Sequence, residues 1–222
     1  MSIRSEMIKF AILCKASSSA GRQQVLDQYS SGTLDVQILD EYSNEDVMCV
    51  RDQQTGEVIL AIRGTDNKNK TGNRLRDVIS DLFILINRKE LMPRLVEIEG
   101  LVERLIQRYG KDCVVLTGHS LGGFLAVSVS EDLGVKAKVF NVGSSPFGVS
   151  TRARGTSTAG GPGGSRDNKN ITVFTTNDPF KLLIDPLSIT STLRDDYKTY
   201  RVPKKENIGI HSIDNFLPNK KV

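Results

Sequence analysis

Apolar residues recur at two spacings along this chain, and each spacing predicts a kind of element. A period of three to four is typical of helices, and it predicts helices over residues 5–16, 22–29, 78–86 and 91–109. Short β-branched runs are typical of strands, and they predict strands over residues 47–50, 58–63, 114–116, 136–141 and 171–175. Because strands alternate with helices, we expect an α/β fold with a mainly parallel central sheet flanked by helices.

Polar and glycine-rich segments separate these elements. Residues 52–56 predict a hairpin turn between two strands, and residues 66–76 hold no apolar face and predict a loop. Residues 155–165 are a low-complexity, Gly-rich run that predicts a flexible loop. It follows a strand of a parallel sheet and therefore emerges at the carboxyl edge, where it either borders the substrate or is a tolerated surface insertion.

The strand at 114–116 runs directly into a Gly-x-Ser-x-Gly pattern, Gly118-His119-Ser120-Leu121-Gly122. A helix-forming run, 124–133, follows it. This is the layout of a nucleophile elbow, a sharp strand-to-helix turn that lifts a serine oxygen clear of the backbone. Glycine is needed because the turn is crowded. The Leu121 amide lies at a helix N-terminus, where it is suited to bind a developing oxyanion.

A serine nucleophile needs a base, and histidine is the usual one because its pKa lies near neutrality. The chain has two histidines. His119 precedes Ser120 on a tight turn and is expected to point away from it. His211 is therefore the candidate base.

The third member of such a triad is an acid that lies between serine and histidine in the sequence. Asp178 follows the strand at 171–175 in an Asn-Asp-Pro turn, and this position favours it. Asp185 is the alternative, whereas Asp195 and Asp196 resemble a solvated pair. Asp178 also fits the N-cap of a short helix beginning at Pro179.

The strand at 58–63 ends in Arg63-Gly64-Thr65. An amide exposed at the end of a strand can donate a hydrogen bond to an oxyanion. This pattern fits Thr65 as the second donor of an oxyanion hole, beside Leu121, and it fits the plain end of a strand equally.

Composition is that of an ordinary globular protein, with 222 residues, 38% hydrophobic and 25% charged. This length fits one domain spanning 1–222. The net charge of +4 is mild, and no basic cluster is interleaved with aromatic residues, which disfavours nucleic-acid binding. No spacing of residues indicates a metal site, and the expected chemistry needs no cofactor.

Three cysteines, Cys14, Cys49 and Cys113, lie among apolar neighbours and predict buried free thiols. Their odd number favours a reducing compartment. No apolar run reaches the length of a transmembrane helix. The run 8–15 is interrupted by Lys9, so we interpret it as part of an amphipathic helix rather than a signal peptide. A cytoplasmic location is favoured over secretion.

Three segments together resemble the class 3 lipase family, the fungal-type lipases. They are Ile62 to Thr65 followed by Asp77 to Leu82, the elbow Leu116 to Gly123, and Asn177-Asp178-Pro179 with His211. The resemblance implies an α/β-hydrolase fold and hydrolysis of carboxylic esters, often of lipids. It also implies Ser120, Asp178 and His211 as the triad, with Thr65 and Leu121 as the oxyanion hole.

The segment 66–74 departs from the family pattern, because it is polar and basic where relatives usually carry a helical lid with an apolar face. This favours small esters or phospholipids over bulk triglyceride. Lys68, Lys70, Arg74 and Arg76 fit either transient contact with an anionic membrane surface or plain solubility charges. Two alternatives stay open for the whole chain: a non-catalytic binding module on the same fold, and a thioesterase or acyltransferase that uses the same triad.

Overall fold

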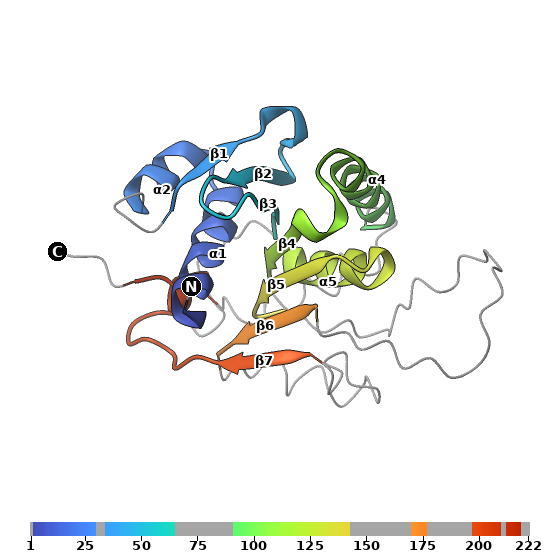
Figure 1. Ribbon diagram of the computed structural model, residues 1–222. Coiled ribbons are helices and arrows are strands. Elements are labelled where there is room, and N and C mark those ends of the chain that lie inside the picture. Colours follow the sequence, from blue (N-terminus) through green and yellow to red (C-terminus); the bar gives the residue numbers. More distant parts are fainter. Residues whose placement is uncertain are drawn as a thin grey trace, which may run out of the picture.

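The computed structural model describes residues 2–29, 34–64, 91–142, 170–176, 197–209 and 212–218. In these residues seven strands form one sheet (Figure 1). They are β1 (Val36–Ile38), β2 (Val47–Asp52), β3 (Val58–Ile62), β4 (Val114–His119), β5 (Lys136–Phe140), β6 (Ile171–Thr175) and β7 (Lys198–Arg201). The helices are α1 (Ile3–Ser17), α2 (Arg22–Tyr29), α4 (Leu91–Tyr109) and α5 (Leu121–Leu133), with short 3-10 turns η1 (Asp40–Tyr42), η2 (Lys111–Cys113) and η4 (Ile213–Phe216).

The strands lie in the sheet in the same order as in the chain. β1, β2 and β3 pair antiparallel, and every later pair is parallel. The register places Ile62 beside Gly118, and His119 beside Phe140, which in turn lies beside Phe174. The segments that leave β3, β4, β5 and β6 therefore all start at one edge of the sheet.

Each face of the sheet has its own core, because side chains alternate along a strand. Along β3, Val58, Leu60 and Ile62 pack with α4 and α5, whereas Ile59 and Ala61 pack with α1. Figure 1 shows α4 and α5 together on one side of the sheet and α1 on the other. Two crossovers that advance in the same direction put their helices on the same face when both have the usual right-handed sense.

Helix α1 is more deeply buried than an amphipathic helix, which corrects the expectation for this segment. Every residue from Lys9 to Cys14 is buried, so that stretch is covered on all sides. The sheet lies against one side of α1, and α2 and η4 contact it as well. Lys15 also bonds Asp214 of η4, with 2.5 Å between Nζ and Oδ1.

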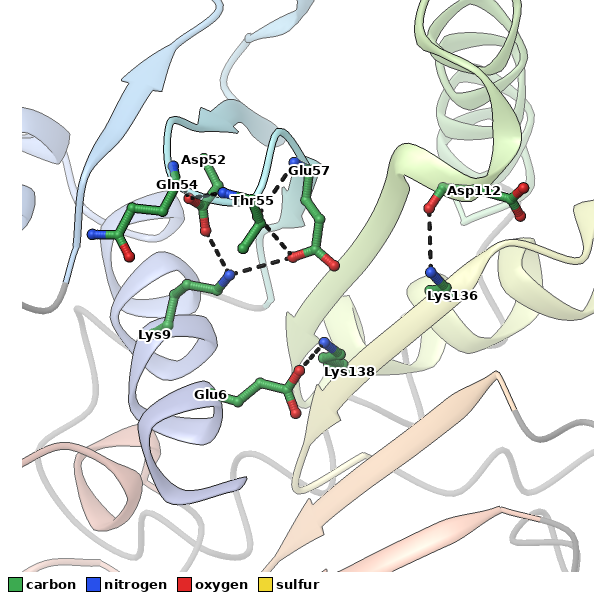
Figure 2. Close-up of polar contacts among 9 residues, drawn as sticks. All are labelled: Glu6, Lys9, Asp52, Gln54, Thr55, Glu57, Asp112, Lys136 and Lys138. Atoms are coloured by element: carbon green, nitrogen blue, oxygen red, sulfur yellow. Dashed lines mark hydrogen bonds and ion pairs between the residues drawn. The ribbon is translucent and has the colours of Figure 1, made fainter. Parts of the chain in front are cut away.

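A buried ion pair joins α1 to the hairpin between β2 and β3 (Figure 2). Lys9 Nζ lies 2.6 Å from Asp52 Oδ2 and 3.3 Å from Glu57 Oε2, and the side chains of Lys9 and Asp52 are each 4% exposed. Lys138 of β5 pairs with Glu6, one turn before Lys9 on α1. Charges that enter such a core must be paired, so these contacts fix where α1 sits on the sheet.

Most predicted elements in the described ranges are confirmed: the helices at 5–16, 22–29, 91–109 and 124–133, the strands at 47–50, 58–63, 114–116, 136–141 and 171–175, and the 52–56 hairpin. The mostly parallel sheet with flanking helices confirms the α/β class. β1 and β7 were not predicted. The segments 66–76, 78–86 and 155–165 lie outside the described residues.

The prediction of three buried thiols is wrong for one of them. Cys14 and Cys49 are buried, but Cys113 is exposed. It ends the η2 turn just before β4 begins, so its side chain lies outside the sheet core although apolar residues follow it.

Replacing Asp52 with Ala should destabilise the fold. The change leaves Lys9 with Glu57 alone and removes the acceptor, Asp52 Oδ1, for the amides of Gln54 and Thr55. Breaking a buried pair costs about 3 kcal/mol or more, measurable by urea unfolding. Asp52→Asn, which keeps an oxygen for the turn amides, should lose less. A loss within about 0.5 kcal/mol for Asp52→Ala, the usual range for surface changes, would contradict this role.

Stability should also fall in acid through Asp52. Burial alone raises the pKa of Asp52, but hydrogen bonds from Lys9 and the turn amides outweigh it and hold the pKa below its ordinary value of 3.8. Because its pKa is lower in the folded than in the unfolded state, ionised Asp52 stabilises the fold fully above pH 3.8. This contribution is lost as the pH falls through the folded-state pKa. Urea unfolding in a series from neutral to acid pH should therefore show a shallower acid loss in Asp52→Asn than in the wild type. An equal loss of stability in acid for the two proteins would show that Asp52 does not contribute to it.

Candidate active site

Ser120 has an unusual backbone conformation, with φ 58° and ψ −121°. Residues other than glycine disfavour positive φ, and such a conformation costs on the order of 1–3 kcal/mol. Ser120 directly follows β4 and is the N-cap residue of α5, and it is 7% exposed. The sequence Gly118 to Gly122 thus forms a strand-turn-helix with strain at the serine, as the elbow pattern predicts.

The glycines of the elbow are required because backbone packs directly on backbone there. A Cβ added at Gly118 would lie 2.3 Å from the carbonyl carbon of Gly122, and one added at Gly122 would lie 2.2 Å from Ile62 O. Just after the neighbouring strand β3, a Cβ at Gly64 would lie 2.7 Å from His119 O. All three distances are shorter than real Cβ contacts allow. The ends of β3 and β4 and the first turn of α5 are therefore in van der Waals contact through their main chains.

Hydrogen bonds hold the elbow to its neighbours. Ser120 N donates to Phe140 O of β5 at 3.1 Å, and Phe124 N donates to Ser120 O at 3.0 Å as the first turn of α5. The Leu121 amide occupies the first helical position, where an N–H has no partner within the helix. Helix N-termini favour negative charge, so this amide is suited to an oxyanion formed beside Ser120.

Asn141 fixes the edge of the sheet where β6 ends. It follows β5 with φ 39° and is 3% exposed. Its Oδ1 accepts from Thr176 N at 2.9 Å and from Thr176 Oγ1 at 3.3 Å, while its own amide donates to Phe174 O. Asn141 therefore anchors the chain two residues before Asp178. Sequence reasoning missed this role, for which an Asn directly after a strand at the carboxyl edge was the available signal.

Asn215 ties together the residues on either side of Ile210 and His211. Its Nδ2 donates to Gly209 O at 2.8 Å and to Ser212 O at 3.0 Å, and Asn215 is 2% exposed. The Ser212 amide also donates to Gly209 O.

The next residue, Phe216, packs edge-on against Phe140, with ring centroids 5.1 Å apart. Phe140 is the residue whose carbonyl accepts from Ser120 N. The segment that flanks His211 and the elbow therefore share one core.

Of the predicted site residues, the structure describes Ser120 and Leu121 and brings them into the elbow geometry. Thr65, Asp178, the alternative Asp185, and His211 lie outside the described residues. Their roles stay predictions. The structure places Gly64 directly before Thr65, Ser212 directly after His211, and Thr176 two residues before Asp178. His119 is half-buried at the end of β4.

Two of the thiols are poor candidates for a competing nucleophile. Burial raises the pKa of both Cys14 and Cys49 to about 12, so both remain protonated and weakly nucleophilic at neutral pH. Within the described ranges no group of three or more His, Cys, Asp or Glu side chains is arranged to hold a metal ion. None of the helices described there is long and apolar enough to cross a membrane.

A search of protein-family models found none that matches this chain, and a search of curated proteins found no relative. The resemblance to class 3 lipases therefore rests on the motifs in the sequence.

Replacing Gly122 with Ala should disrupt the elbow, because the new Cβ would overlap the main chain of Ile62. We expect a loss of about 3 kcal/mol, at the upper end for overpacking, in urea unfolding. Gly100→Ala is the matched control: Gly100 lies in α4 with nothing within 4 Å of an added Cβ. It should stabilise the protein by about 0.5–1 kcal/mol. Equal effects of the two changes would contradict the close approach.

Proposed function

We propose that this protein is a serine hydrolase of the α/β-hydrolase type that cleaves carboxylic esters. The observation that carries this proposal is the strained backbone of Ser120 in a turn that glycines alone can form. Strain of about 1–3 kcal/mol persists only where the surroundings enforce it, and it clusters at functional sites. A serine that merely capped a helix would adopt an extended backbone instead.

The reaction would proceed by acyl transfer to the serine and then to water. Ser120 Oγ attacks the ester carbonyl carbon while His211 takes its proton, and Asp178 orients His211. The amides of Leu121 and Thr65 stabilise the oxyanion. When the intermediate collapses, His211 gives the proton to the departing alcohol. Water, deprotonated by His211, then attacks the acyl-enzyme and releases the carboxylic acid.

Lipid or phospholipid acyl esters are the favoured substrates within this proposal. The resemblance to class 3 lipases supports an acyl ester, and the polar segment 66–74 supports a substrate other than bulk triglyceride. Both supports come from the sequence, and the leaving group is set by the shape of a pocket around Ser120.

Replacing Ser120 with Ala should lower kcat on short nitrophenyl esters by several orders of magnitude, because acyl transfer loses its nucleophile. A fluorophosphonate probe should label the wild type at Ser120 and leave Ser120→Ala unlabelled. Ser128→Ala is the matched control: Ser128 lies two turns along α5 and donates to Phe124 O. It should retain both labelling and activity.

Hydrolysis that survives in Ser120→Ala would contradict this proposal, and a folded wild type that takes no label would favour a non-catalytic binding module. Thioesters and acyl acceptors belong in the same substrate panel. A strong preference for thioesters, or acyl transfer to an alcohol in place of water, would assign the same serine to a thioesterase or an acyltransferase.

A further inference from the structure

Arg94 of α4 reaches the main chain at the end of β3. Its Nη2 donates to Arg63 O at 2.6 Å and lies 3.4 Å from Asp46 O. The same guanidinium pairs with the Asp46 carboxylate at 3.1 Å. Asp46 O also accepts from Arg63 N at 2.9 Å. One guanidinium therefore binds both the carbonyl that ends β3 and the segment that pairs with it.

The peptide between Arg63 and Gly64 also lies against the elbow. A Cβ at Gly122 would lie 2.9 Å from the carbonyl carbon of Arg63 and 3.0 Å from its oxygen. Gly64, the next residue, lies against His119 O. The Arg63–Gly64 peptide is thus held between the guanidinium of Arg94 and the bare first turn of α5.

The charge state of Arg94 suits this contact. Burial lowers its pKa, the Asp46 carboxylate opposes that change, and Arg63 adds to it. A guanidinium nevertheless stays protonated at neutral pH. Its Nε is buried and has no hydrogen-bond partner among the residues that the structure describes. A well-packed structural pair would satisfy that nitrogen, so the group is positioned by its Nη2 contacts at some cost.

We propose that Arg94 is a positioning residue for the oxyanion hole: its bond to the Arg63 carbonyl holds the Arg63–Gly64 peptide against the first turn of α5, where the Leu121 amide lies. This inference rests on the proposed hydrolase function. Without the guanidinium, the Arg63 carbonyl loses its charge-assisted bond, and the Arg63–Gly64 peptide can shift against the elbow. The Leu121 amide would then lose main-chain packing that holds it in place, and a displacement of about 1 Å at such a site can cost about 100-fold in rate.

A merely stabilising ion pair explains these contacts less well. The Asp46 carboxylate is 49% exposed, and pairs open to solvent contribute little to stability. The short bond to Arg63 O, by contrast, is charge-assisted and lies on the partly buried side of the guanidinium. The main effect of removing Arg94 should therefore appear in catalysis.

The test compares Arg94→Met and Arg94→Lys with Arg104→Met, an exposed arginine on the same helix. For Arg94→Met we expect kcat on a nitrophenyl ester to fall about 10- to 100-fold, with KM changed less than about threefold, because an oxyanion contact acts in the transition state. The pH profile of kcat/KM should keep its midpoint, since the base is not touched. Arg104→Met should behave as the wild type.

Arg94→Lys covers the case in which the Met variant does not fold. An ammonium keeps the charge but lacks the planar fork that binds a carbonyl and a carboxylate together, so kcat should fall about tenfold. The melting temperature of each variant should lie near that of the wild type.

A folded Arg94 variant with wild-type kcat overturns the inference, as does a loss that appears in KM or in the pH midpoint alone. Those results leave the hydrolase proposal intact when the wild type is active and Ser120→Ala is not. A wild type with neither hydrolysis nor labelling overturns both.

Discussion

Direct contact between main chains, where β3 and β4 end and α5 begins, is the constraint on which the rest of this structure depends. Gly64, Gly118 and Gly122 leave no space for a side chain between these segments. The strained serine, the first amide of α5 and the neighbouring end of β3 are held within one contact region as a result. The proposed reaction needs a nucleophile and its oxyanion donors held in a fixed relation before any substrate arrives, and close main-chain packing gives Ser120 and Leu121 that rigidity.

The core on the α1 face of the sheet supports this region. Ser120 is bonded to Phe140, and Phe140 packs between Phe174 and Phe216 in the core around α1. α1 is in turn located by Lys9 and Asp52, charges that are stable in a core only as a pair. Because the ion pair lies at the hairpin between β2 and β3, it acts at the edge of the sheet opposite the elbow. The two edges thus have separate roles: one fixes the helix, and the other carries the candidate chemistry.

Local patterns in the sequence predicted most of the secondary structure, and long-range contacts account for what they missed. The apolar residues at helical spacing in α4 are a local signal, and so are the β-branched runs of β3 and β4 and the elbow motif. β1 alternates apolar and polar residues but is only three residues long, too short to indicate a strand by itself. β7 is exposed along its whole length and has no alternating pattern. The roles of Arg94 and Asn141 depend on partners from other elements, which no local window contains. Cys113 was misjudged because its apolar neighbours belong to the strand that starts one residue later.

The order of the strands has a consequence for how the chain folds. Each strand pairs with the next one in the chain, so the sheet and the face under α4 and α5 can grow by adding adjacent segments. The opposite face cannot, because it closes by docking η4 on α1, and the Lys15–Asp214 bond spans 199 residues. Contacts of such separation form late, since a long loop must be closed first. A chain still emerging during synthesis would therefore expose Phe140 and its apolar neighbours until η4 arrives, and this interval is when the protein is most exposed to aggregation.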